Sequence, residues 1–117
     1  MSAVEAVLGY MFADKSLLEA ALTHASFRDA GAGETYERLE FLGDRGISAA
    51  VAWHLYRTHP GLRPGPLSRL HDVNVSTEKL ARATVAWGLH RFLRHEMPVF
   101  ALSVGDFAAE AAACWLI

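Results

Sequence analysis

Three acidic side chains in the middle of this 117-residue chain are spaced so that together they could hold a metal ion. Glu37, Glu40 and Asp44 stand at positions i, i+3 and i+7, which places them along one narrow stripe of an α-helix. Like charges at these spacings repel one another, and partly buried carboxylates are costly without a partner. A hard divalent cation with oxygen ligands, such as Mg²⁺, would remove that cost. The alternative from spacing alone is a solvated acidic face with Arg38 and Arg45 as counter-charges.

The sequence around these acids is a specific motif. From Glu37 to Asp44 it reads Glu-Arg-Leu-Glu-Phe-Leu-Gly-Asp. This run resembles, without a gap, the signature of the ribonuclease III family, endonucleases that cut double-stranded RNA with Mg²⁺. Further stretches resemble the family in the same order along the chain: 8–12, 17–26, 65–70 and 75–81. The resemblance therefore implies a Mg²⁺-dependent endoribonuclease that cleaves double-stranded RNA and acts in RNA processing.

The resemblance also implies roles for individual residues. It implies a Mg²⁺ site, in which Mn²⁺ could substitute, with acids from two helices as ligands: Glu40, Asp44, Asp106 and Glu110. Asp44 and Glu110 would act directly in catalysis, and Glu37 would be a supporting acid. Phe41 would pack across a two-fold dimer interface, in a homodimer or in a heterodimer with another ribonuclease III-like chain.

Two departures from the family pattern favour an alternative function. Where the family often has an acid between a glycine and a leucine, this chain has Pro66. In the last helix the family has an aspartate and a glutamate three residues apart, whereas Asp106 and Glu110 are four apart. Either Ala109 replaces the glutamate or Phe107 replaces the aspartate, and the sequence leaves both alignments open. The alternative is a catalytically impaired subunit that binds structured RNA in intron splicing or ribosomal assembly.

The composition fits one small intracellular domain. Hydrophobic residues make up 52% of the chain, which is enough for a core. No apolar run approaches the length of a membrane span, and polar residues before position 30 argue against a secretory signal. The single cysteine, Cys114, fits a reducing compartment, so we expect a cytoplasmic protein without a membrane partner. The net charge of −2 does not by itself indicate a nucleic-acid binder, although most basic residues are arginine, which suits phosphate contacts.

The hydrophobic periodicity predicts an all-α fold, a ribonuclease III-like helical domain around the central signature helix. We expect helices over these approximate ranges: 4–10, 16–22, 36–58, 67–73, 76–87 and 104–117. The run from Ile47 to Tyr56 is almost wholly apolar, so the central helix should pass through the core. Pro66 suits the first residue of the fourth helix. Asp14 or Ser16 can cap the second helix, and Ser76 can cap the fifth.

Two further expectations concern a histidine and the end of the chain. His24 lies at the end of the second predicted helix, where we expect a packed, hydrogen-bonded residue rather than a general base. Residues 1–117 should form one ribonuclease III-like domain that lacks the family's final helix or helices. The apolar end of the sequence, 114–117, then indicates a fragment or a subunit that a partner completes.

Overall fold

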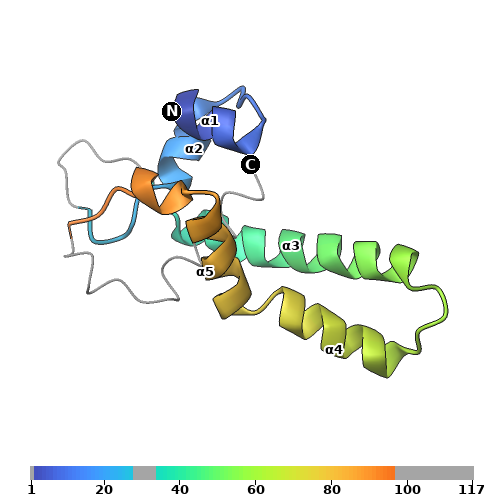
Figure 1. The fold of residues 1–117 in the computed structure, drawn as a ribbon. Coiled ribbons are helices and arrows are strands. Elements are labelled where there is room, and N and C mark those ends of the chain that lie inside the picture. The colour runs from blue at the N-terminus through green and yellow to red at the C-terminus, as the bar shows by residue number, and fades with distance from the viewer. Residues whose placement is uncertain (1, 28–33, 97–117) are drawn as a thin grey trace.

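The computed structural model describes residues 2–27 and 34–96, and these residues confirm the all-α prediction. The helices are α1 (Ser2–Leu8), α2 (Lys15–Ala21), α3 (Glu37–Thr58), α4 (Pro64–Asn74), α5 (Thr77–Ala86) and the 3₁₀ helix η1 (Leu89–Phe92) (Figure 1). In these ranges the only β-type pairing is an isolated parallel bridge between Thr23 and Arg94. No helix in the described part has both the length and the hydrophobicity to cross a membrane. The predicted helix over 104–117 lies outside the described residues.

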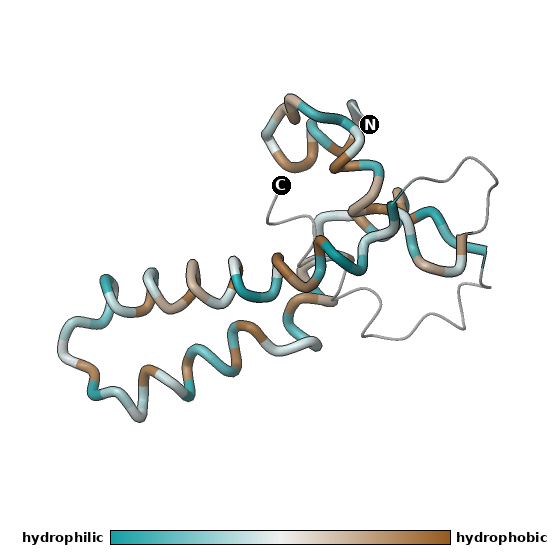
Figure 2. The backbone as a smooth tube through the Cα atoms, turned by 180° about the vertical axis from the view of Figure 1, so that it is seen from behind, coloured by the Kyte–Doolittle hydropathy of each residue, from teal (hydrophilic) through white to brown (hydrophobic). Residues whose placement is uncertain are grey.

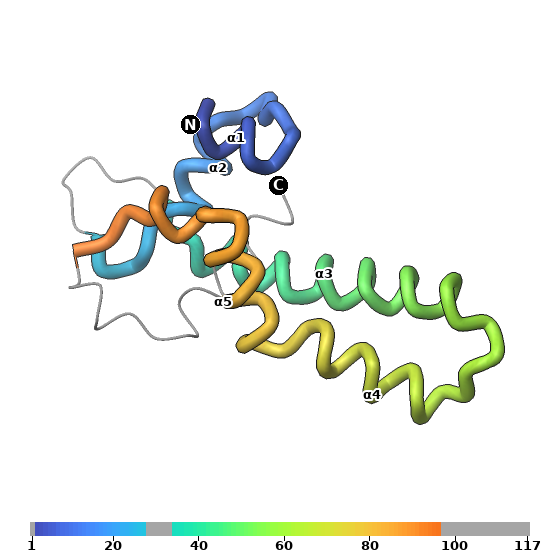
Figure 3. The backbone as a smooth tube through the Cα atoms, viewed as in Figure 1, coloured from blue at the N-terminus to red at the C-terminus, as the bar shows by residue number. Residues whose placement is uncertain are grey.

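Helices α3 and α4 lie side by side as an arm that projects away from the N-terminal helices (Figures 1 and 3). Hydrophobic residues recur along both helices of the arm, between hydrophilic ones (Figure 2). In α3 the buried residues are Gly43, Ile47 and Leu55, while Trp53 and Tyr56 are exposed. The expectation that this helix passes through the core is therefore wrong for its second half. The reason is that, within residues 2–27 and 34–96, the arm extends beyond the helices that could cover its outer side.

The main core lies between the N-terminal helices, the start of α3 and η1. It consists of Val4, Phe12, Leu18, Ala21, Leu22, Tyr36 and Leu89. A smaller cluster joins α3 to α5 and contains Ile47, Leu80 and Ala81. The burial of these apolar side chains favours folding by roughly 25 cal/mol per Å² removed from water. The first part of α3 is thus held by two clusters, one near each end of the signature.

Side-chain capping fixes the starts of α2 and α5. Asp14 caps α2, with its Oδ1 accepting the Ser16 N–H at 2.9 Å, and Ser76 caps α5, as the sequence predicts. The prediction for α4 was wrong, because this helix begins at Pro64 rather than at Pro66. Arg63 before it is extended, as a residue before proline prefers, and proline in the first turn lacks only an N–H that would have no helical partner.

Arg94 ties the end of the described chain to the N-terminal helices. Its N–H donates to Leu22 O at 2.8 Å, and its carbonyl oxygen accepts the N–H of His24 at 2.9 Å. The Arg94 side chain forms an ion pair with Glu19, and its guanidinium carbon lies 4.6 Å from the centroid of the Phe27 ring. Backbone and side chain together therefore clamp the segment that follows α2.

Candidate metal centre

The three acids of the sequence motif lie on one continuous helix. Glu37, Glu40 and Asp44, here called the acidic stripe, all belong to α3, whose helical periodicity brings them to one side. Glu37 and Asp44 are exposed and Glu40 is half-buried, so their carboxylates lie at the surface. The helix is regular here, since the Glu40 N–H donates to Tyr36 O at 2.8 Å. The predicted placement of the stripe on a helix is confirmed.

The two arginines next to these acids, Arg38 and Arg45, have other partners in the described part of the chain. Arg38 donates to Glu34 across 2.7 Å as an i,i+4 pair. Arg45 donates to Phe41 O at 2.6 Å, and its guanidinium carbon lies 3.7 Å from the Phe41 ring centroid. These contacts argue against the interpretation in which Arg38 and Arg45 serve as the counter-charges of the acidic stripe.

The donors of the stripe fit a hard cation, but they do not make a complete ligand set. Carboxylate oxygens are the ligands that Mg²⁺ prefers, and Glu40 and Asp44 are one turn apart on the helix. Among residues 2–27 and 34–96 no group of three or more His, Cys, Asp or Glu side chains could hold a metal ion. Asp106 and Glu110 lie outside the described residues. The predicted metal site, which includes acids from beyond these ranges, therefore stays a prediction.

Phe41 lies beside the acidic stripe. It follows Glu37 by four residues and precedes Asp44 by three, so at about 100° per residue it lies roughly 40° and 60° around the helix from them. Its side chain is 62% exposed, so it is no core residue of the described chain. An aromatic ring this exposed is available to a partner.

His24 is packed and hydrogen-bonded, as the sequence analysis predicts. The residue is buried, and its Nδ1 accepts the N–H of Ser26 at 3.0 Å. Its ring stacks on Tyr36, with centroids 5.4 Å apart. These contacts account for the histidine without a role as a general base.

The departure at Pro66 has a structural counterpart. Pro66 lies in the first turn of α4, and that turn contains no acidic residue. The arm therefore offers the acidic stripe no carboxylate from the start of α4.

A hydroxyl, an imidazole and a carboxylate meet between the helices of the arm, which sequence reasoning missed. Ser48 Oγ lies 2.9 Å from His71 Nε2, and His71 Nδ1 lies 3.3 Å from Asp72 Oδ1. A groove of about 670 Å³ beside them includes Tyr56 and Leu67 in its lining. Ser48 is inside a helix, where backbone N–H groups are used by the helical ladder and cannot stabilise an oxyanion. The cluster cross-links α3 and α4, and no local sequence signal joins residues this far apart.

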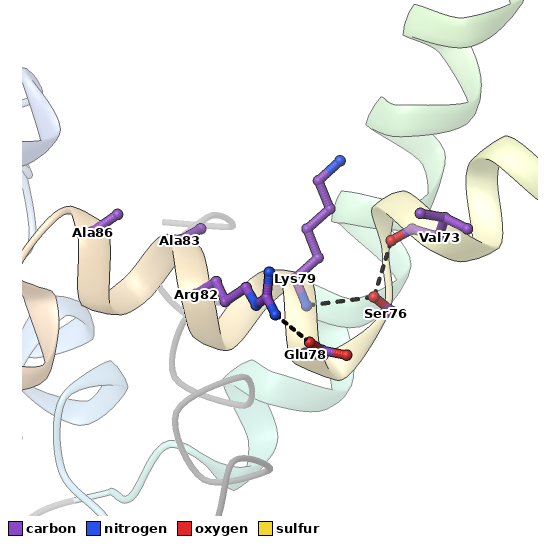
Figure 4. A pocket seen from close by; sticks show the side chains of 7 residues that line it. All are labelled: Val73, Ser76, Glu78, Lys79, Arg82, Ala83 and Ala86. Carbon is purple, nitrogen blue, oxygen red and sulfur yellow. Dashed lines mark hydrogen bonds and ion pairs between the residues drawn. The ribbon is translucent and has the colours of Figure 1, made fainter.

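A second groove, of about 510 Å³, follows the surface of α5 (Figure 4). Lys79 and Arg82 project from this helix, and Arg82 pairs with Glu78 at 2.7 Å. Ser76 Oγ donates to Val73 O at 2.9 Å and accepts the Lys79 N–H. Among the described residues, no acid of the stripe lines this groove. The acids of the stripe therefore lie outside both of these grooves.

Comparisons with known proteins place the chain in a family. The profile described as "Ribonuclease-III-like" matches residues 14–105. Ribonuclease 3-like protein 3 of Oryza sativa subsp. japonica is 50% identical over 94% of this chain and 37% of its own length. Ribonuclease 3 of Agrobacterium fabrum is 47% identical over 80% of this chain and 39% of its own length. The chain thus spans well under half of either relative.

A solved structure has the same fold. The nuclease domain of ribonuclease III from Campylobacter jejuni superimposes with a TM-score of 0.82 at 30% identity, covering 95% of this chain and 78% of that domain. That structure is described for flexibility in a region involved in dimer formation. The all-α arrangement around α3 is therefore that of a known nuclease domain.

Proposed function

This chain belongs to the ribonuclease III family, and we propose that it is the catalytic domain of a Mg²⁺-dependent endoribonuclease that cleaves double-stranded RNA during RNA processing. The observation that carries the proposal is the acidic stripe on α3, whose neighbouring arginines have other partners. Relatives named ribonuclease 3 and ribonuclease 3-like support the reaction class. We expect the reaction to take place in the cytoplasm.

The stripe provides the groups that this chemistry needs. When bound, Mg²⁺ lowers the pKa of a coordinated water and stabilises the charge that develops on the scissile phosphate. Glu40 and Asp44 would hold the ion, with Asp106, Glu110 or both as further ligands and Glu37 in support. Because Glu40 and Asp44 are one turn apart on α3, the helix backbone holds the two side chains on the same face, from which both could reach one ion.

Double-stranded RNA is the substrate that we propose, because the relatives named ribonuclease 3 support this reaction class. A-form duplexes are recognised mainly by shape and by their 2′-hydroxyls, so specificity for base sequence should be slight. We further propose a two-fold dimer through the exposed ring of Phe41, which would give the assembly one site for each strand of the duplex. The dimer-forming region described for the Campylobacter jejuni nuclease domain supports this assembly.

Cleavage of an end-labelled RNA duplex tests the proposal. The chain should cut the duplex in the presence of Mg²⁺, and cleavage should stop when EDTA removes the ion. Asp44→Ala should abolish cleavage, whereas Asp72→Ala, which removes an exposed aspartate of α4, should not. An unchanged rate in the Asp44→Ala variant would overturn the assignment of the stripe.

A second function is favoured by one observation. The first turn of α4 has Pro66 and no acid, where the family often has an acidic residue. A chain that binds the duplex but leaves it intact in both Mg²⁺ and Mn²⁺ would be the catalytically impaired alternative, an RNA-binding subunit. The same labelled duplex distinguishes the two functions, because binding and cutting are read separately.

A further inference from the structure

Helix α3 begins without a side-chain cap, although its first turn contains two acids of the stripe. Its N-cap residue is Tyr36, which makes no side-chain capping hydrogen bond. The Tyr36 N–H instead donates to Thr23 O at 3.0 Å, and the side chain is buried. The ring stacks on His24 with an interplanar angle of 25°. Contacts with the segment after α2, and no local cap, therefore set where α3 starts.

His24 is itself held on several sides. Its N–H donates to Arg94 O at 2.9 Å, and its carbonyl oxygen accepts the N–H of Phe27 at 2.9 Å. Its Nδ1 accepts the N–H of Ser26, which leaves the ring proton on Nε2 in the neutral form and fixes the plane of the imidazole. Tyr36 thus stacks on a ring that can neither turn nor shift freely.

Hydrogen bonds connect Tyr36 and its neighbour Thr35 directly to the acidic stripe. Tyr36 O accepts the Glu40 N–H at 2.8 Å, and the neighbouring Thr35 Oγ1 donates to Glu37 Oε2 at 3.0 Å. Asp44 lies three residues before Ile47, which packs with α5 in the second cluster. The helix on either side of the stripe is therefore held by different contacts. Loss of the contacts at Tyr36 would let the first turn of α3 unwind, which would move Glu37 and Glu40 relative to Asp44.

We propose that His24 and Tyr36 are a positioning pair that fixes the first turn of α3, and with it the carboxylates of Glu37 and Glu40, in register with Asp44 for a divalent cation. This inference rests on the proposed function. Metal sites require ligand placement within about 0.5 Å, and an error of about 1 Å can cost on the order of 100-fold in rate. The stack acts on the site through the backbone and touches neither ion nor RNA.

The test measures Mn²⁺ affinity by electron paramagnetic resonance, together with kcat and KM for duplex cleavage, in the full chain. Tyr36→Leu should raise the Mn²⁺ dissociation constant about 10-fold or more and lower kcat by about 100-fold, with KM little changed. Tyr36→Phe keeps the ring and should retain both properties. His24→Asn keeps an acceptor for the Ser26 N–H but removes the stack, and should behave as Tyr36→Leu does.

A matched control separates positioning from general loosening of the core. Leu18→Ala weakens the same cluster without removing the stack, so below its melting temperature it should bind Mn²⁺ as the wild type does. The inference is overturned if Leu18→Ala loses as much affinity as Tyr36→Leu, if Tyr36→Phe is as impaired as Tyr36→Leu, or if Tyr36→Leu and His24→Asn bind normally. A wild-type chain that neither binds Mn²⁺ nor cuts RNA overturns the proposed function as well, so the two failures are distinguishable.

Discussion

The guanidinium group of Arg45 covers one face of Phe41, with 3.7 Å between its central carbon and the ring centroid. The same group donates to Phe41 O, so the ring and the arginine are held together on the helix surface. A cation–π pair at an exposed site contributes roughly 0.5–1 kcal/mol. This pair keeps the ring in one orientation beside the acidic stripe, which lowers the cost of burying it against a partner.

Phe41→Ala should therefore weaken self-association. An aromatic residue buried at the centre of an interface typically contributes at least about 2 kcal/mol, which corresponds to a dissociation constant raised about 30-fold. Sedimentation velocity over a concentration series measures the change. Trp53→Ala is the matched control, because Trp53 is 63% exposed on the same helix and has Arg57 over its ring. A chain that stays monomeric at high concentration with or without Phe41 would contradict the prediction.

The spacing of the last acids predicts weak cleavage that can be improved. If Ala109 stands in the place of the family's glutamate, then Ala109→Glu should restore a ligand and raise kcat in Mg²⁺. If Glu110 substitutes for that ligand, Glu110→Ala should remove the remaining activity, by on the order of 100-fold. Single-turnover cleavage of the labelled duplex measures both. No gain from the first change and no loss from the second, with duplex binding intact, would identify the chain as a non-catalytic RNA binder.

Glu5 should make stability depend on pH. The hydrogen bond from the Lys15 ammonium, followed by that from the Phe12 N–H at 2.7 Å, lowers the pKa of the Glu5 carboxyl below its usual value of 4.5. The folded state thus prefers the ionised form, so this stabilisation is present above about pH 4.5 and is lost as the pH falls through the lowered pKa.

Glu5→Gln should accordingly lower the urea midpoint near neutral pH and have less effect in acid. Urea titrations at about pH 7 and about pH 3 measure the difference. Glu78→Gln is the control, since Glu78 forms only an exposed pair with Arg82 and such pairs contribute little. If Glu5→Gln lowers the urea midpoint equally at both pH values, the carboxylate does not stabilise the fold through its charge.

Substitutions of two adjacent leucines of α2 by alanine should differ sharply in their effect on the free energy of unfolding. Leu18 is fully buried at 0% exposure, whereas Leu17 is 40% exposed. Leu18→Ala should cost about 2–5 kcal/mol of unfolding free energy, because it leaves a cavity in the main core. Leu17→Ala should stay within about 0.5 kcal/mol. Chemical denaturation measures both, and similar values for the two variants would contradict the described core.

The sequence predicted best what depends on local chemistry. The bounds of α3 were correct to within one residue, because the long helical run ends at the turn that contains Pro60 and Gly61. Capping of α5 by Ser76 was also predicted, and Asp14 was one of the two candidates, with Ser16, for the cap of α2. A short polar side chain before an apolar periodic run is a local signal. The shared helix face of the three acids could be predicted from their spacing alone, because helical periodicity does not depend on the rest of the fold.

What the sequence could not predict depends on contacts between distant segments. The exposure of Trp53 follows from the projection of the arm, which no periodicity encodes. The partners of Tyr36 come from the segment after α2, which Arg94 in turn clamps. The start of α4 was predicted at Pro66 but lies at Pro64, because either proline fits a first helical turn and the local sequence does not distinguish them.

The clamp formed by Arg94 affects the order in which parts of the chain can fold during translation. Arg94 pairs with Glu19, 75 positions earlier, so this contact must wait for the intervening chain to be synthesised. At about 5–20 residues per second, that delay is roughly 4–15 s. The link between Ser48 and His71 spans only 23 positions and becomes available sooner. The arm that carries the acidic stripe can therefore form before the segment that supports Tyr36 is clamped.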